Sequence, residues 1–249
     1  MKLIKEIAGR IFAVWAILMF TLTLLVFLIP FLLFSYPLAD PQKTFRFIAQ
    51  SRVWMGIFLP LIGCPLRVRG RQHFAPGQNY VVVCNHNSLM DVPISSPAIP
   101  GGNKTIAKSE MAKIPLFGMI YRTGSILVDR RSEKSRKDSY SAMKKVLGMG
   151  LHMCIYPEGT RNKTDQPLKA FHDGAFRLAL DTRKAVVPGI IFNTRRVLPA
   201  SKPFYLMPHP LEIHFLAPIP VEANDTVETL KNRVHSIMEE YYVNNKKKK

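Results

Sequence analysis

The sequence has few cysteines and few acidic residues, and each scarcity narrows the class of protein. Its 249 residues include three cysteines, Cys64, Cys84 and Cys154, which lie far apart and form no C-x-x-C pair. This spacing fits neither a disulfide scaffold nor a zinc ribbon, and it favours a reducing compartment. Acidic residues total 17 against 35 Lys and Arg, so the formal net charge is +18. That excess predicts an anionic partner, namely nucleic acid, a membrane surface or a phosphorylated substrate.

Apolar residues are abundant, at 47% of the chain. A disordered basic protein is therefore excluded, because such chains lack the apolar surface needed for a core. The length suits one domain, or one domain with an appendage, and it is sufficient for a core without a disulfide or metal.

An uncharged segment near the N-terminus, Ile11–Ala39, predicts a retained membrane helix, because about 20 apolar residues cross a bilayer. A signal peptide is the alternative, but it needs a shorter apolar region and a small-residue cleavage site. A second uncharged stretch, Val53–Leu66, is short and interrupted by Gly and Pro. It is re-entrant, interfacial or buried, and with the first segment it could form a hairpin in one leaflet. We expect residues 1–64 to anchor the protein, with the remainder on the cytoplasmic side.

After residue 64, short apolar runs alternate with helical patterns, which predicts one α/β domain over residues 65–243 with a mostly parallel central sheet flanked by helices. The predicted strands are Tyr80–Cys84, Ser125–Val128, His152–Tyr156, Ala185–Phe192 and Leu211–Phe215. Pro188 places the fourth at an edge or a bend. The predicted helices are Ile114–Tyr121, Ser135–Leu147, Gly174–Leu180 and a last one starting near Asp225, with Glu228 completing a capping box. Residues 244–249 form a basic tail, either solvated, lipid-binding or a sorting signal.

Three polar clusters follow predicted strands, where ligands bind in such sheets. The first holds His86 and Asp91, a base and a carboxylate able to hold its ring, if His86 lies in a turn and Asp91 begins a helix. The alternative is a helix start capped by Asn87 or Ser88. A nucleophilic role for Ser88 is disfavoured, because no G-x-S-x-G context surrounds it.

The second and third clusters contain donors suited to a phosphate. Gly124–Arg130 ends in an arginine that can grip a phosphate through two parallel hydrogen bonds. Glu158–Arg161 contains a glycine that permits a tight turn, followed by Thr160 and Arg161 as further donors. Each cluster, taken alone, could also be an ordinary surface segment.

Together the clusters resemble the glycerolipid acyltransferase family, and within it the bacterial 1-acyl-glycerol-3-phosphate acyltransferases. Asn85-His86 with Asp91 matches the family's N-H-x-x-x-x-D motif, and Gly124 with Ile126 and Arg130 matches its G-x-I-x-x-x-R motif. Glu158-Gly159-Thr160-Arg161 matches E-G-T-R, and Val187-Pro188 matches the fourth motif. The order and spacing agree over residues 65–220.

The resemblance implies a glycerol-3-phosphate acyltransferase-like fold and a membrane-bound enzyme of phospholipid biosynthesis. It would move an acyl group from a thioester of coenzyme A or acyl carrier protein to the sn-2 hydroxyl of lysophosphatidic acid, giving phosphatidic acid without a cofactor or a metal. His86 would be the general base and Asp91 its orienting partner. The remaining implied site residues would bind the acceptor's phosphate or shape its pocket: Lys108, Arg130, Glu158, Gly159, Thr160 and Arg161.

Two features leave alternatives open. The family often has two lysines in a Phe-Lys-Lys-Gly segment, where this sequence has Phe171-His172-Asp173-Gly174. A different acceptor, such as glycerol 3-phosphate, another lysophospholipid or a lyso-aminolipid, is one alternative function. A non-catalytic membrane-binding protein is another. A nucleic-acid partner is not expected, because no recognised binding motif accompanies the charge.

Overall fold

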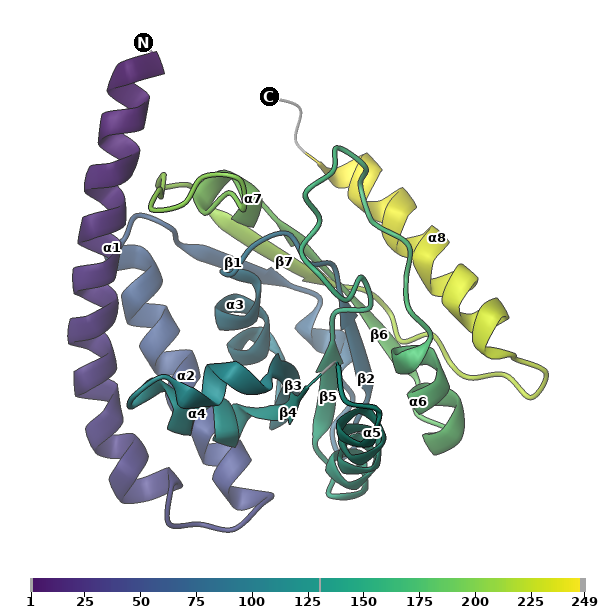
Figure 1. Ribbon diagram of the computed structural model, residues 1–249. Helices are drawn as coiled ribbons and strands as arrows, with labels where there is room; N and C mark the ends of the chain where they lie inside the picture. Colours follow the sequence, from purple (N-terminus) through teal and green to yellow (C-terminus); the bar gives the residue numbers. More distant parts are fainter. Residues whose placement is uncertain (1, 130, 247–249) are drawn as a thin grey trace.

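A central seven-stranded sheet forms the framework of the molecule, seen here in a computed structural model that describes residues 2–129 and 131–246 (Figure 1). The strand order is β1-β7-β6-β2-β5-β3-β4. Strands β6, β2, β5, β3 and β4 are parallel, whereas β7 pairs antiparallel with β6 and parallel with β1. The strands are β1 (Leu66–Arg69), β2 (Val81–Cys84), β3 (Asn103–Lys108), β4 (Ser125–Val128), β5 (His152–Ile155), β6 (Val186–Phe192) and β7 (Leu211–Phe215). The predicted α/β class with a mostly parallel sheet is confirmed.

Helices cover both faces of the sheet, so the central strands are apolar on both sides. In β2, Val82 and Cys84 face one hydrophobic cluster while Val81 and Val83 face the other. The first cluster lies under α1 (Lys2–Pro30), α2 (Gln42–Leu61), α3 (Asp91–Ala98) and α4 (Phe117–Gly124). The second lies under α5 (Glu133–Gly148), α6 (Gly174–Thr182) and α8 (Val227–Asn245). A short helix, α7 (Thr194–Val197), follows β6.

The two uncharged N-terminal segments form an antiparallel pair of helices along one side of the domain (Figure 1). Helix α1 runs through a π-helical turn at Phe31–Ser35 before the chain reverses into α2. Two tryptophans link the pair, because Trp15 Nε1 donates to the Leu61 carbonyl and Trp54 Nε1 to Thr23 Oγ1, both at 2.9 Å. Residues 3–35 are long and apolar enough to cross a membrane, and most of their apolar side chains are exposed. These features indicate association with a membrane.

Several predicted elements match the structure. Strands β4 and β7 have the predicted bounds, β2 and β5 differ by one residue, and α5 and α6 contain the predicted helices. Helix α4 begins later than predicted because Pro115 holds Ile114 in an extended conformation and Leu116 adopts a positive φ of 60°.

The structure excludes one alternative of the prediction and corrects another detail. Strand β6, which contains Pro188, lies between β7 and β2 rather than at an edge. The proline is tolerated because the ladder with β7 begins one residue later, at Gly189, and the Pro188 carbonyl accepts from the Leu216 N–H. The last helix is capped by Thr226 with Thr229 rather than by Asp225 with Glu228, since each threonine side chain accepts from the other's backbone N–H.

Candidate active site

The loop after β2 brings a histidine and a carboxylate into contact at the carboxyl edge of the central strands. His86 Nδ1 lies 2.8 Å from Asp91 Oδ2, and Asp91, the first residue of α3, is fully buried. The same oxygen accepts the backbone N–H groups of Asn87 at 2.6 Å and Ser88 at 2.7 Å. These contacts hold the carboxylate in place, and the carboxylate in turn fixes the ring of His86.

Neighbouring side chains hold this loop in place. The Asn85 side chain accepts the Ile191 N–H at 2.7 Å and donates to the Ile191 carbonyl at 3.0 Å, which ties the loop to β6. Ser88 Oγ donates to the Leu198 carbonyl at 2.7 Å, so its hydroxyl is occupied. Helix α3 begins after Met90 and lacks a side-chain cap, so neither Asn87 nor Ser88 caps it.

Glu158, on the loop after β5, contacts the backbone of His86. Its Oε1 accepts the His86 N–H at 2.7 Å, and its Oε2 accepts the Lys169 N–H at 3.1 Å. The Asn162 N–H donates to the His86 carbonyl at 2.6 Å. Burial raises the pKa of Glu158, although the two backbone donors and nearby positive groups act in the opposite direction. Glu158 and Asn162 therefore hold the backbone N–H and the backbone carbonyl of His86 in place.

The rest of that segment faces polar and solvent-accessible groups. Gly159 has a φ of +68°, which favours glycine, and a Cβ there would lie 2.8 Å from the exposed His172 ring, which would have to shift. Thr160 Oγ1 accepts from Lys169 Nζ at 2.7 Å. Arg161 is half-buried, and within residues 2–129 and 131–246 its side chain has no hydrogen-bond or ion-pair partner. Arg161 directly precedes Asn162, whose N–H binds the His86 carbonyl, and an unpaired guanidinium on this loop suits an anionic ligand.

The other two predicted phosphate-binding residues give no direct sign of an anion site. Arg130 lies outside the described residues. Lys108, at the end of β3, is exposed and pairs with Glu110 at 2.8 Å. Its ammonium group is on the same edge of the sheet as His86, but its partner is a surface carboxylate.

A cavity of about 300 Å³ opens beside His86, with Tyr156, Gly159 and His172 in its lining. The Tyr156 ring centroid is 4.6 Å from that of His86, and the Tyr156 hydroxyl bonds Ser95 Oγ at 2.6 Å. Burial is the main cause that raises the pKa of Tyr156, so it packs as a neutral phenol. Sequence reasoning gave Tyr156 no role, although an aromatic residue directly before Pro157-Glu158 was the available signal.

An apolar pocket adjoins this cavity, and Val92 lines both. Its other walls come from α1, α2 and α4 and include Phe20, Trp54 and Ile120. Residues 2–129 and 131–246 contain no group of three His, Cys, Asp or Glu side chains that could hold a metal ion.

The fold and the site define an α/β protein with a histidine–carboxylate pair able to take a proton from a hydroxyl group. The family model described as Acyltransferase matches residues 65–192, about half of the chain. This chain therefore belongs to the acyltransferase family.

Similar proteins point the same way. A human 1-acyl-sn-glycerol-3-phosphate acyltransferase alpha is 33% identical over 186 residues, covering 72% of this chain and 64% of that protein. A Helicobacter pylori 1-acyl-sn-glycerol-3-phosphate acyltransferase is 32% identical over 155 residues, covering 62% and 64%. The chain thus spans less than two thirds of these curated relatives. The crystal structure of the LPA acyltransferase PlsC from Thermotoga maritima matches with a TM-score of 0.82 over 98% of this chain and 99% of that one, at 19% identity, which shows a shared fold.

Proposed function

We propose that this protein transfers an acyl group from a thioester to the sn-2 hydroxyl of lysophosphatidic acid, giving phosphatidic acid for phospholipid synthesis. The observation that carries the proposal is the pair of His86 and buried Asp91, held at 2.8 Å at the carboxyl edge of the sheet. The names of the similar proteins support the choice of acceptor.

In this proposal His86 is the general base. Because Nδ1 is directed to Asp91, Nε2 is the ring atom left to take the proton of the acceptor hydroxyl. The oxygen attacks the thioester carbonyl carbon, and the tetrahedral intermediate collapses as the carbon–sulfur bond breaks. The imidazolium then returns its proton to the thiolate, and Asp91 stabilises the positive charge while it exists. No covalent enzyme intermediate is needed.

Arginines would select the acceptor by its phosphate. Arg161 offers an unpaired guanidinium on the loop whose next residue, Asn162, binds the His86 carbonyl, and Arg130 occupies the matching position of the second motif. Glu158, Gly159 and Thr160 would shape this region by fixing the loop, while Lys108 would need to leave Glu110 to reach a phosphate. A phosphate held at a fixed distance from Nε2 would present one hydroxyl of the glycerol backbone to the base.

The apolar pocket next to Val92 would receive the acyl chain. Its free volume is about 80 Å³, below the roughly 150 Å³ of an apolar cavity that binds benzene. A long chain would therefore have to separate the side chains of α1, α2 and α4 as it enters. Because α1 and α2 form part of the wall, the membrane-associated helices would also help to bind substrate.

The helix pair would lie within one leaflet rather than cross the bilayer. Helix α1 contacts the domain at two levels, with Gly9 against Tyr205 and Phe20 against Phe117. A perpendicular crossing would carry these parts of the domain into the hydrocarbon, which charged surfaces disfavour. The domain would face the cytoplasm, at the inner membrane in a bacterium, where thioester donors are made.

The test is acyl transfer by the purified protein in detergent, read by mass spectrometry against several lysophospholipids, glycerol 3-phosphate and both classes of donor. We expect phosphatidic acid from lysophosphatidic acid, and a loss of at least 10³-fold in His86→Ala. His73→Ala is the matched control, because His73 follows β1 at the opposite edge of the sheet. Full activity in His86→Ala, or preference for an acceptor without phosphate, would refute the proposal.

A further inference from the structure

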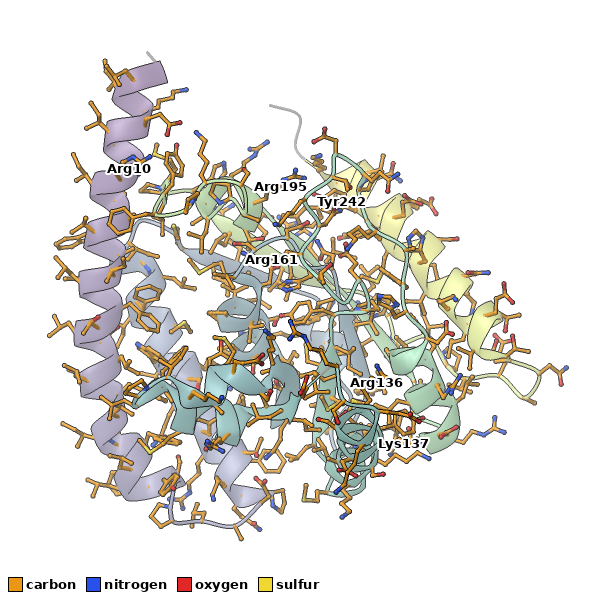
Figure 2. The ribbon with its side chains drawn as sticks, in the orientation of Figure 1. Arg10, Arg136, Lys137, Arg161, Arg195 and Tyr242 are labelled. Carbon is orange, nitrogen blue, oxygen red and sulfur yellow. The ribbon has the colours of Figure 1, made fainter. Side chains whose placement is uncertain are left out.

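A second and larger hollow lies on the same edge of the sheet, on the other side of the catalytic loop. Its volume is about 780 Å³, and its lining includes Asn87, Arg195, Arg196, Tyr242 and Lys246. We call it the basic groove. Figure 2 shows Arg195 near α7 and Tyr242 near the C-terminal end of α8, in the upper part of the molecule, with Arg161 below them. The proposed acyl-transfer steps assign no role to this groove.

The cations of the basic groove are fixed in position but weakly neutralised. Arg195 donates to the carbonyl oxygens of Thr164 and Lys163, and the nearest carboxylate oxygen, from the fully exposed Asp165, is 3.7 Å away. Arg196 Nη1 lies 3.3 Å from the His209 ring. Carbonyl and imidazole groups orient a guanidinium without cancelling its charge, so the groove keeps a positive potential.

The C-terminal end of α8 completes the groove. Lys246 Nζ lies 5.6 Å from the Tyr242 ring centroid, and the Tyr242 ring stacks on Phe192 with centroids 5.3 Å apart. The groove also contains Glu212, but that carboxylate is buried and its Oε2 lies 3.2 Å from His214 Nε2. An entering anion would therefore meet mainly Arg195, Arg196 and Lys246.

The groove reaches the reacting centre. Asn87, in its lining, directly follows His86 in the chain. The phenol of Tyr242 is within electrostatic reach of both Arg195 and Asp91. On the other side of the loop, Val92 borders the apolar pocket. A donor laid through the site would thus have its acyl chain in the apolar pocket, its thioester at His86 and its carrier in the basic groove.

We infer that the basic groove binds the phosphate-bearing nucleotide end of a coenzyme A thioester. This inference rests on the proposed function and names its acyl donor. A hollow of several hundred cubic ångströms is the size of a small-molecule site, whereas an acidic carrier protein would need a broad and flatter surface. A pantetheine arm separates the phosphates from the thioester, so the phosphates can meet the cations that line the groove while the thioester lies at His86.

The test uses Arg196→Gln combined with Lys246→Gln, since Arg195 also holds the 163–165 loop and its removal would disturb the fold. The control is Arg183→Gln with Lys184→Gln, which removes the same charge at the opposite edge of the sheet, before β6. We expect the groove variant to bind coenzyme A, measured by calorimetry, about tenfold more weakly or worse, because charged hydrogen bonds are lost. The KM for palmitoyl-CoA should rise to a similar extent.

Palmitoyl-pantetheine, which lacks the phosphates, is the discriminating donor. Wild-type, groove variant and control should use it with equal kcat/KM, and the KM for lysophosphatidic acid should not change. Unchanged coenzyme A affinity in the groove variant would overturn the inference, as would an equal loss with palmitoyl-pantetheine. An effect confined to acyl carrier protein thioesters would overturn it too and assign the groove to that protein. If coenzyme A binds through the groove but no acceptor is acylated, the proposed function fails while the groove assignment stands.

Discussion

The carboxylate of Asp91 receives three hydrogen bonds through one oxygen, and the contact with His86 Nδ1 fixes the orientation of the imidazole ring. Its other oxygen, Oδ1, is buried without a hydrogen-bond partner among the described residues. A buried carboxylate with one unsatisfied oxygen costs stability, which the fold tolerates in return for a fixed imidazole ring. The backbone of His86 is held as firmly, by Glu158 on its N–H and Asn162 on its carbonyl.

Gly159→Ala should lower the free energy of unfolding by about 1–2 kcal/mol through its positive φ, and further through contact with His172. Gly77→Ala is the matched control, because Gly77 also has a positive φ, of 75°, but its Cβ would meet nothing within 4 Å. Denaturant unfolding in detergent measures both. Adding His172→Ala should recover only the contact part, and equal losses at Gly77 and Gly159 would show that the contact is unimportant.

His152 predicts a pH dependence of stability. Its ring is stacked on Tyr80 and accepts the Tyr80 N–H at 3.1 Å, and burial lowers its pKa to about 4. The unfolded state, with a pKa near 6.5, therefore binds a proton first as the pH falls. Stability should be lost progressively between pH 6.5 and 4, on the order of 2 kcal/mol by pH 5. In His152→Gln the same comparison of pH 7.5 with pH 5 should show a smaller loss, and an unchanged slope would contradict this account.

Among individual residues, the sequence-based predictions included the proposed catalytic pair but did not describe the contacts of Asn85 and Tyr156. His86 and Asp91 meet as predicted, because both flank a strand end and a helix start that the pattern made visible. Asn85 and Tyr156 act through partners far away in the chain, on β6 and α3. No local pattern encodes such partners, and the roles assigned to the predicted site residues stay predictions until they are tested.

Helix α1 leaves a long apolar surface uncovered by protein. Apolar side chains project outward along it, among them Ile11, Leu18, Leu25 and Ile29. Its inner face packs on α2 through aromatic rings, including Phe27 stacked on Trp54 with centroids 4.6 Å apart. An outward apolar stripe of this length needs a hydrocarbon environment, which a membrane supplies.

Leu18→Lys combined with Leu25→Lys should weaken vesicle binding by tenfold or more, because each lysine opposes burial of α1 in the acyl region. Both leucines are about half exposed, so the protein itself should unfold at an unchanged temperature. Ile237→Lys on α8 is the control, an exposed apolar residue away from the helix pair. Co-flotation with vesicles measures binding, and full binding by the double variant would exclude α1 as the membrane contact.

At the level of elements, periodicity found the strands that are apolar and continuous. It missed β3 (Asn103–Lys108), because three of its buried residues are polar: Asn103 bonds Ser96, Lys104 pairs with Asp40 and Thr105 bonds Ser125. It also missed β1, whose four residues alternate two arginines with two apolar side chains. Such strands are stabilised by partners elsewhere in the fold. The proposed boundary between the anchor and the domain, at residue 64, stays a prediction.

Across the whole molecule, the net charge of +18 and the apolar helix α1 act on the same partner by different forces. The charge attracts an anionic surface and is screened by salt, whereas the apolar contact is not. Binding to vesicles containing phosphatidylglycerol should therefore exceed binding to phosphatidylcholine vesicles at 50 mM salt, and the two should converge near 0.5 M. Co-flotation over a salt series measures this, and a constant difference would show that the charge serves another purpose.

The shared core of α1, α2 and the sheet has a consequence for biosynthesis. The ribosome releases the apolar helices first, yet the strands that they cover are far downstream, since β1 must await β7 for its pairing of Leu66 with Leu211. Asn85 must likewise await Ile191. During translation the apolar surface of the early helices would be covered by lipid, because the strands do not yet exist. The nascent chain would therefore reach the bilayer before its catalytic centre has folded. The enzyme would then complete its folding already at the surface where its substrate resides.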